Sequence, residues 1–113
     1  MRVIAGRFKF TPLVSPKGRD IRPTTDRVKE DIFNILKPFT DRGGKFLDMF
    51  CGTGAIGIEA VSRGMDSAEL VDSSSQALET ASKNVQRTKS PQFFRLVRSE
   101  AKTYLIEIGR AHV

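Results

Sequence analysis

Short apolar runs alternate with amphipathic stretches along the second half of the chain. Residues 46–50 and 68–72 are mostly apolar runs that are too short for helices, so each is predicted to be a buried strand. Residues 56–61 and 77–85 carry apolar side chains at helical spacing, and residues 93–98 form a third strand-like run. The order strand, helix, strand, helix, strand predicts the start of a parallel, right-handed α/β sheet.

The first 45 residues follow a different pattern. Residues 2–10 contain short β-prone runs on either side of a glycine, which predicts a small β-hairpin. Residues 11–24 are rich in proline and lack apolar periodicity, so we expect an extended connection there. Apolar side chains at positions 28, 32, 35 and 36 then predict an amphipathic helix.

Local signals mark the ends of the predicted helices. Pro38 is expected to end the first helix, because proline has no backbone N–H and clashes with the preceding turn. Gly64 is expected just past the end of the second helix. Ser73 and Gln76 have the spacing of a capping box, which predicts the start of the third helix.

Positive charge is concentrated near the N-terminus of this 113-residue chain, whose formal net charge is +6. Residues 1–45 hold 11 Lys and Arg against 5 Asp and Glu, whereas the remaining residues hold 8 of each. Phe8 and Phe10 are interleaved with these cations. Cations that neutralise phosphates and rings that stack on bases are typical of nucleic-acid surfaces. A solvated basic surface that maintains solubility is the alternative.

Several classes of protein are excluded by composition. No apolar run approaches the roughly 18 residues of a membrane span, and the N-terminus lacks the apolar core of a secretory signal, so we expect a cytoplasmic protein. Cys51 is the single cysteine and His112 the single histidine. An internal disulfide, a zinc cluster and a histidine-based triad are therefore not expected, and no metal site is predicted.

A glycine-rich motif lies where the first predicted strand of the sheet turns into a helix. Residues 52–57 match G-x-G-x-x-G, a pattern that is weak by itself. Asp72 ends the next strand 20 residues after Gly52, where a carboxylate accepts hydrogen bonds from ribose hydroxyls in doubly wound folds. The alternative role for Asp72 is to cap the following helix.

The carboxylate of Asp48 distinguishes between nucleotide ligands. It stands four residues before Gly52, where it would repel a pyrophosphate but could pair with a cation. S-adenosylmethionine carries an ammonium and a sulfonium and no phosphate, so this position favours it over NAD. Two alternatives stay open: Asp48 only caps the turn, or the chain is an NAD-binding half-domain.

Two longer motifs resemble a known family. Residues 48–60, DMFCGTGAIGIEA, are similar to the cofactor motif of class I methyltransferases. Residues 22–36, RPTTDRVKEDIFNIL, together with the opening residues 2–7, resemble the RsmD-type ribosomal RNA methyltransferases. The resemblance extends over residues 1–107 and implies a Rossmann-like fold and transfer of a methyl group from S-adenosylmethionine to a guanine N2 of small-subunit ribosomal RNA.

The resemblance also implies roles for individual residues. The cofactor would be bound by Asp48, Phe50, Cys51, Gly52, Thr53, Gly54, Asp72 and Glu100. The RNA or the target pocket would be contacted by Arg7, Lys9, Arg22, Thr24 and Arg27. Cys51 is expected to be a small packing group and not a nucleophile. Glu100 stands where the family usually has an aspartate beside the adenine.

One departure from the family pattern concerns the reacting groups. The family carries Asp/Asn-Pro-Pro-Phe/Tyr after a fourth strand, and this chain has no such motif, so its catalytic residues are unknown. We therefore expect an N-terminal fragment, inactive by itself: residues 1–45 form a basic RNA-binding arm and helix, residues 46–107 the first half of the cofactor domain, and residues 108–113 a non-native tail. A catalytically inactive RNA- or nucleotide-binding module is the alternative.

The expected partners follow from the same resemblance. The substrate would be ribosomal RNA or the small-subunit ribosomal particle. No membrane or metal is expected as a partner, and the full-length protein is expected to be a monomer.

Overall fold

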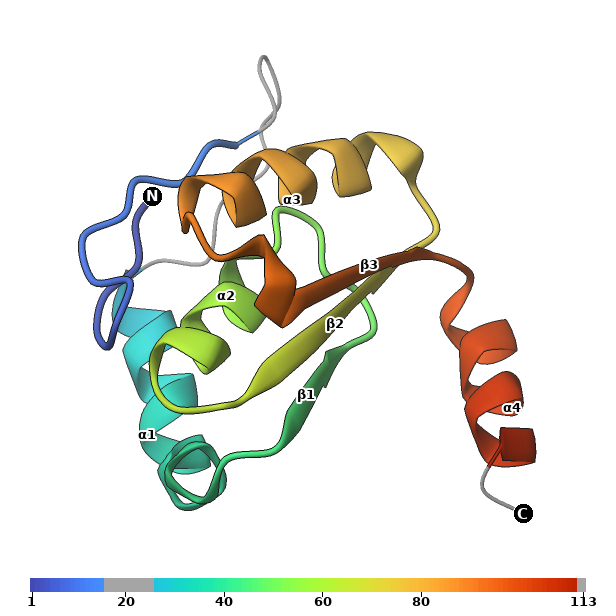
Figure 1. Ribbon diagram of the computed structural model, residues 1–113, viewed down its shortest axis with the longest axis horizontal. Helices are drawn as coiled ribbons and strands as arrows, with labels where there is room; N and C mark the ends of the chain where they lie inside the picture. Colours follow the sequence, from blue (N-terminus) through green and yellow to red (C-terminus); the bar gives the residue numbers. More distant parts are fainter. Residues whose placement is uncertain (16–25, 112–113) are drawn as a thin grey trace.

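The computed structural model describes residues 1–15 and 26–111 (Figure 1). A parallel three-stranded sheet lies at its centre, and helices flank the sheet. The elements in chain order are α1 (Asp26–Arg42), β1 (Lys45–Asp48), α2 (Ala55–Ser62), β2 (Ser67–Asp72), α3 (Ser75–Arg87), a 3-10 turn (Pro91–Phe93), β3 (Phe94–Arg98) and α4 (Ala101–Ala111).

The sheet has the order β1-β2-β3, with both pairs of strands parallel. Right-handed connections that step in one direction place their helices on the same face, and α2 and α3 both pack there and contact each other. On the opposite face, the Tyr104 hydroxyl of α4 donates a hydrogen bond to Glu69 of β2. The α/β sheet predicted from the apolar runs is confirmed.

The hydrophobic core lies between α2, α3 and the sheet. Ile58, Leu70 and Ala81 are fully buried there. Gly57 allows α2 to lie close to the sheet, because a Cβ atom at this position would come within 2.2 Å of Leu70 Cδ2. The third glycine of the motif therefore serves helix-to-strand packing, and the first two are left for the turn.

Helix α1 differs from the prediction in its end and in its buried face. It continues through Pro38 to Arg42, since the proline lies exposed in the last turns and its missing N–H removes only one bond there. The side chains that face the interior include Lys29 and Phe33, which are fully buried, whereas Ile35 is 77% exposed. The predicted apolar stripe is thus rotated, because the buried charge of Lys29 is neutralised by an acid on α2.

The N-terminal hairpin forms with longer turns than predicted. Residues 1–3 pair with residues 11–13 through a single antiparallel bridge, and residues 7–10, predicted to be extended, form turns. The physical cause is docking on the C-terminal end of α2: the N–H groups of Arg7 and Phe8 donate to the carbonyl and hydroxyl oxygens of Ser62. We call residues 4–10 the N-terminal loop.

Gly6 is required for this docking. Its φ angle is +89°, and a Cβ atom there would come within 1.8 Å of the Ser62 carbonyl oxygen. The Ser62 hydroxyl also donates to the carbonyl of Ala5 at 2.6 Å. A glycine with positive φ is therefore what lets the N-terminal loop lie directly on α2.

The start of α3 is one residue later than the predicted capping box. Ser74 is the N-cap, and its hydroxyl oxygen accepts a hydrogen bond from the N–H of Ala77 at 3.1 Å. Ser73 lies in the preceding turn, where its carbonyl accepts from Arg98 Nε. The shift arises because Asp72 fixes the turn by accepting the N–H of Ser74.

Candidate functional site

The candidate ligand-binding residues gather at the carboxyl edge of the sheet. Asp48 is the last residue of β1 and Asp72 the last residue of β2, and these strands are neighbours. The predicted strand 46–50 ends at Asp48, and the chain then turns toward α2. In parallel sheets the crevice beyond the carboxyl ends of the strands is the usual ligand site.

Residues 51–54, which we call the glycine turn, connect β1 to α2. The N–H of Cys51 donates to the Val71 carbonyl of β2, and the N–H of Gly54 donates to the Cys51 carbonyl at 2.7 Å. Gly52 has φ +51°, and a Cβ atom built on it would meet no atom within 4 Å. The backbone of the turn is therefore fixed by its hydrogen bond to β2, and Gly52 faces open space.

The N-terminus of α2 is only weakly capped. The N-cap residue Gly54 has no side chain that could accept a hydrogen bond, the Thr53 hydroxyl accepts the N–H of Ala55 at a long 3.4 Å, and the first turn of α2 contains no acidic residue. The first N–H groups of a helix lack intrahelical partners. The glycine turn therefore ends in backbone donors that point toward the carboxyl edge of the sheet.

Asp72 holds the glycine turn in place. One oxygen of its carboxylate accepts the N–H of Gly52 at 3.1 Å, and the other accepts the N–H of Ser74 at 2.9 Å. A carboxylate has about four acceptor positions, so each oxygen keeps one for a ligand hydroxyl. The alternative role of Asp72 as the helix cap is wrong, because Ser74 is the N-cap of α3; Asp72 fixes the turn before the helix and still presents acceptors at the edge.

Asp48 is in an environment that disfavours its negative charge. Burial raises the pKa of the Asp48 carboxyl, the N–H of Phe50 lowers it by donating at 3.2 Å, and the nearby charge of Asp72 raises it again. The net shift is upward. Two carboxylates at one edge repel each other, so a cation bound between them would relieve the repulsion.

Cys51 and Phe50 precede the glycines and differ in their surroundings. The Cys51 side chain is buried, and burial, with the charges of Asp48 and Asp72, raises the pKa of its thiol to about 12. A neutral, buried thiol is a packing group and a poor nucleophile. The Phe50 ring is 80% exposed beside the carboxyl edge.

Asn84 is a site residue that the sequence reasoning missed. Its fully buried side chain donates to the carbonyls of Thr53 at 2.8 Å and Val14 at 3.0 Å, and it accepts the N–H of Val14 at 2.7 Å. One amide thereby joins the glycine turn to the chain that follows the hairpin. A polar residue within the apolar stripe of α3, next to Val85, was the available signal.

The opposite end of α2 is closed by a buried ionic cluster. The Glu59 carboxylate lies 3.4 Å from Lys29 Nζ and 2.8 Å from Arg63 Nε. It also accepts the backbone N–H groups of Ile4 and Ala5. The side chains of Glu59 and Lys29 are completely buried, so this cluster is structural: it fixes the N-terminal loop and α1 on α2.

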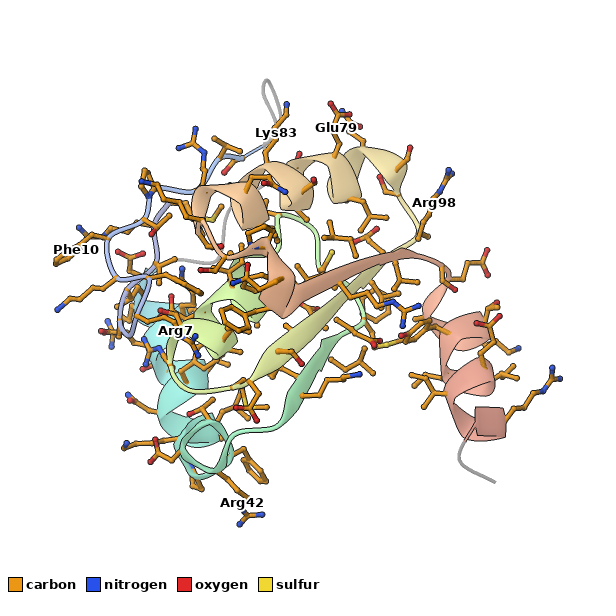
Figure 2. The ribbon with its side chains drawn as sticks, viewed as in Figure 1. Arg7, Phe10, Arg42, Glu79, Lys83 and Arg98 are labelled. Atoms are coloured by element: carbon orange, nitrogen blue, oxygen red, sulfur yellow. The ribbon has the colours of Figure 1, made fainter. Side chains whose placement is uncertain are left out.

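Two of the proposed RNA-contacting residues, Arg7 and Lys9, lie in a segment that docks away from the carboxyl edge. Arg7 and Lys9 are in the N-terminal loop, beside the closed end of α2, and Arg27 is exposed in the first turn of α1 (Figure 2 labels Arg7). Arg22 and Thr24 lie outside the described residues.

Glu100 follows β3 and is exposed. Its neighbour Ser99 donates its N–H to the Asp72 carbonyl at 3.0 Å, which brings this segment to the same edge as Asp72.

Within residues 1–15 and 26–111, no three His, Cys, Asp or Glu side chains are grouped to hold a metal ion. In the same part of the chain, no helix has the length and apolar character needed to cross a membrane.

Comparisons with known proteins give consistent matches. The family model described as conserved hypothetical protein 95 matches residues 1–112. Ribosomal RNA small subunit methyltransferase D of Escherichia coli is 36% identical over 112 residues, which are 99% of this chain and 56% of that protein. YlbH of Bacillus subtilis is 41% identical over 105 residues, or 93% of this chain and 56% of YlbH.

A solved structure agrees with these relatives. The Escherichia coli protein yhhF superposes with a TM-score of 0.79 at 37% identity, covering 93% of this chain and 56% of that one. The chain thus spans about half the length of the relatives that it matches.

Proposed function

The chain belongs to the family described as conserved hypothetical protein 95, the RsmD family, and from this premise we propose that it forms the cofactor-binding half of a ribosomal RNA methyltransferase. Its fold is the Rossmann-like α/β fold of class I methyltransferases. The proposed methyl donor is S-adenosylmethionine, and the proposed target is a guanine N2 in small-subunit ribosomal RNA, so that the protein would act in the cytoplasm.

The observation that carries the proposal is the pairing of Asp48 and Asp72 around an open glycine turn. Two carboxylates at this edge disfavour a phosphate ligand and favour a ligand that brings positive charge and hydroxyls. A Cβ atom built on Gly52 would meet no atom within 4 Å, so the glycine turn is open on this side. The donor set therefore fits S-adenosylmethionine, which has an ammonium, a sulfonium and a ribose.

The residues would bind and orient this cofactor in distinct ways. Asp48 uses one oxygen to accept the N–H of Phe50 and has its other oxygen for the ammonium. Asp72 would accept the ribose hydroxyls with the acceptor positions that Gly52 and Ser74 leave unused. Glu100, on the segment beside Asp72, would contact the adenine amino group.

When bound, S-adenosylmethionine supplies a methyl group activated by its sulfonium. The contribution of this chain is to hold the donor in a fixed orientation, since proximity and orientation provide much of the acceleration in a transfer between two bound reactants. The turn that does so is rigid, because Asp72 holds it from β2 and Asn84 holds it from α3. No proton transfer is assigned to these residues.

Calorimetric titration with S-adenosylmethionine tests the proposal. Asp48→Asn removes the charge and keeps the shape, and we expect the affinity to fall at least about tenfold, as for loss of a charged hydrogen bond. Asp41→Asn is the matched control, because Asp41 is an exposed aspartate of α1 that pairs with Lys37. Equal affinity of the Asp48 variant and the parent would overturn the proposal.

Two alternative functions predict different results. An RNA-binding module without catalysis would bind RNA with a steep salt dependence but transfer no methyl group, even within the longer protein. An NAD-binding half-domain would bind NADH and not S-adenosylhomocysteine. Titration with NADH and with S-adenosylhomocysteine distinguishes the NAD-binding half-domain, and a methyl-transfer assay on the longer protein distinguishes the RNA-binding module.

A further inference from the structure

Phe10 is displayed on the surface, unlike the other phenylalanine of the N-terminal loop. Its ring is 64% exposed, and Figure 2 shows it directed away from the body of the molecule. Phe8, two residues earlier, is 7% exposed and packs near the Phe94 ring, with centroids 6.3 Å apart. The core therefore uses Phe8, and packing gives no reason for an aromatic residue at position 10.

The backbone holds Phe10 in an unfavourable conformation. Its φ angle is +73°, in the left-handed region that side chains with a Cβ atom rarely adopt. The conformation is fixed by hydrogen bonds from the Phe10 N–H to the Val3 carbonyl at 2.9 Å and from the Thr11 N–H to the Phe8 carbonyl at 3.0 Å. Strained positions held by their surroundings occur preferentially at functional sites, so the display of this ring suggests a binding role.

Two cations lie near the Phe10 ring. Lys9 Nζ lies 5.0 Å and the Arg2 guanidinium carbon 5.9 Å from its centroid. Arg7 lies in the same loop, and Arg87 of α3 reaches the Pro12 carbonyl on the returning strand. An exposed ring among cations is complementary to a nucleic-acid strand, in which flat bases alternate with phosphates.

We propose that Phe10 stacks on an unpaired base of the RNA, while Arg2 and Lys9 contact the adjoining phosphates. The base is one that flanks the target and is not the target itself, because the N-terminal loop docks on the end of α2 opposite the glycine turn. The eight residues of α2 separate these ends by about 12 Å. The inference rests on the proposed function, because that function makes RNA the partner.

Fluorescence anisotropy with single-stranded polyuridine and with an RNA duplex, each measured over a series of salt concentrations, tests the proposal. Phe10→Gly removes the ring and suits the positive φ, so the loop keeps its shape. We expect this variant to bind polyuridine about tenfold more weakly with an unchanged salt slope, since no cation is lost. Phe10→Trp is expected to retain the affinity, and binding of the duplex should change little in either variant.

Phe39→Ala is the matched control, since Phe39 is 59% exposed on α1 and should leave binding unchanged. The proposal is overturned if Phe10→Gly binds polyuridine like the parent, or if the parent does not bind RNA, which would assign the ring to a protein contact. Titration of the same variants with S-adenosylmethionine separates the two proposals. A parent that fails to bind this cofactor but shows Phe10-dependent RNA binding refutes the proposed function alone.

Discussion

The two ends of α2 are built in opposite ways. At its N-terminal end the glycine turn is held by Asp72 and Asn84, Gly54 provides no side-chain cap, and Asp48 and Asp72 keep acceptors unused. At its C-terminal end Glu59 has every partner it can take, from Lys29 and Arg63 to the N–H groups of the N-terminal loop.

This difference separates binding from stability within one short helix. Buried charges that are fully paired are costly to disturb, so the C-terminal end of α2 fixes the architecture. Acceptors and donors that remain unused cost the protein little at a solvated edge and are available to a ligand. Changes at the two ends are therefore expected to have different consequences, one for folding and one for binding.

Disrupting the buried ionic cluster around Glu59 should have the largest effect on stability. Glu59→Gln leaves the buried ammonium of Lys29 without its counter-charge, and we expect the free energy of unfolding to fall by about 3–5 kcal/mol. Urea denaturation followed by circular dichroism measures the loss. Glu79→Gln is the control, because Glu79 is an exposed residue of α3 whose pair with Lys83 contributes little (Figure 2). A loss below about 1 kcal/mol at Glu59 would contradict the assigned role.

Removing the Asn84 amide, which clamps the glycine turn to Val14, should lower both the stability of the fold and the affinity for the cofactor. Asn84→Ala leaves buried backbone groups of Val14 and Thr53 without partners, and we expect about 2 kcal/mol of destabilisation. Because the clamp also holds the glycine turn, the affinity for S-adenosylmethionine should fall in variant protein that is still folded. Gln86→Ala, at an exposed position of the same helix, controls for helix propensity. Destabilisation with unchanged affinity would show that the clamp does not position the turn.

The smallest expected effect is a pH-dependent difference in stability between Asp48→Asn and the parent. Burial raises the pKa of Asp48 above 3.8, so the folded state binds the proton of this carboxyl more tightly than the unfolded state does. The protonated carboxyl therefore contributes to stability at low pH, and this contribution is lost as the pH rises through the raised pKa. Asp48→Asn should therefore be slightly more stable than the parent at neutral pH, and the gain should be small because water screens this half-buried group.

Thermal unfolding of both proteins between about pH 4 and pH 7 measures this difference. The gap between Asp48→Asn and the parent should close toward the acidic end of that range, where the parent carboxyl is protonated. A variant less stable than the parent at neutral pH would mean that Asp48 is structural, as are the residues at the other end of α2.

The part of the fold that was predictable is the part that local sequence encodes. The sheet followed from apolar runs, and Gly64 lies just past α2 as expected. The end of α1 was predicted wrongly at Pro38, because tertiary contacts of the last turn outweigh one missing hydrogen bond. The buried face of α1 was predicted only in part: Ile32 and Leu36 pack against the core, but nothing local indicates that Lys29 will be paired inside the protein.

The candidate site divides in the same way. Asp48, the glycines and Asp72 were predicted because their spacing around a strand-to-helix turn is itself the signal. Asn84 and Glu59 were missed because their partners in the N-terminal segment are 54 to 70 residues away in the sequence. A polar residue within an apolar helical stripe indicates a buried hydrogen bond but does not identify its partner.

The sequence by itself determined the order of strands and helices and the residues that line the carboxyl edge, because apolar periodicity and glycine spacing act over a few neighbouring positions. Only the tertiary structure decided that Phe8 is buried and Phe10 displayed, and that Lys29 faces inward. Those outcomes depend on how the N-terminal loop docks on α2, which requires hydrogen bonds between segments more than fifty residues apart. Such contacts form only when the whole chain is folded.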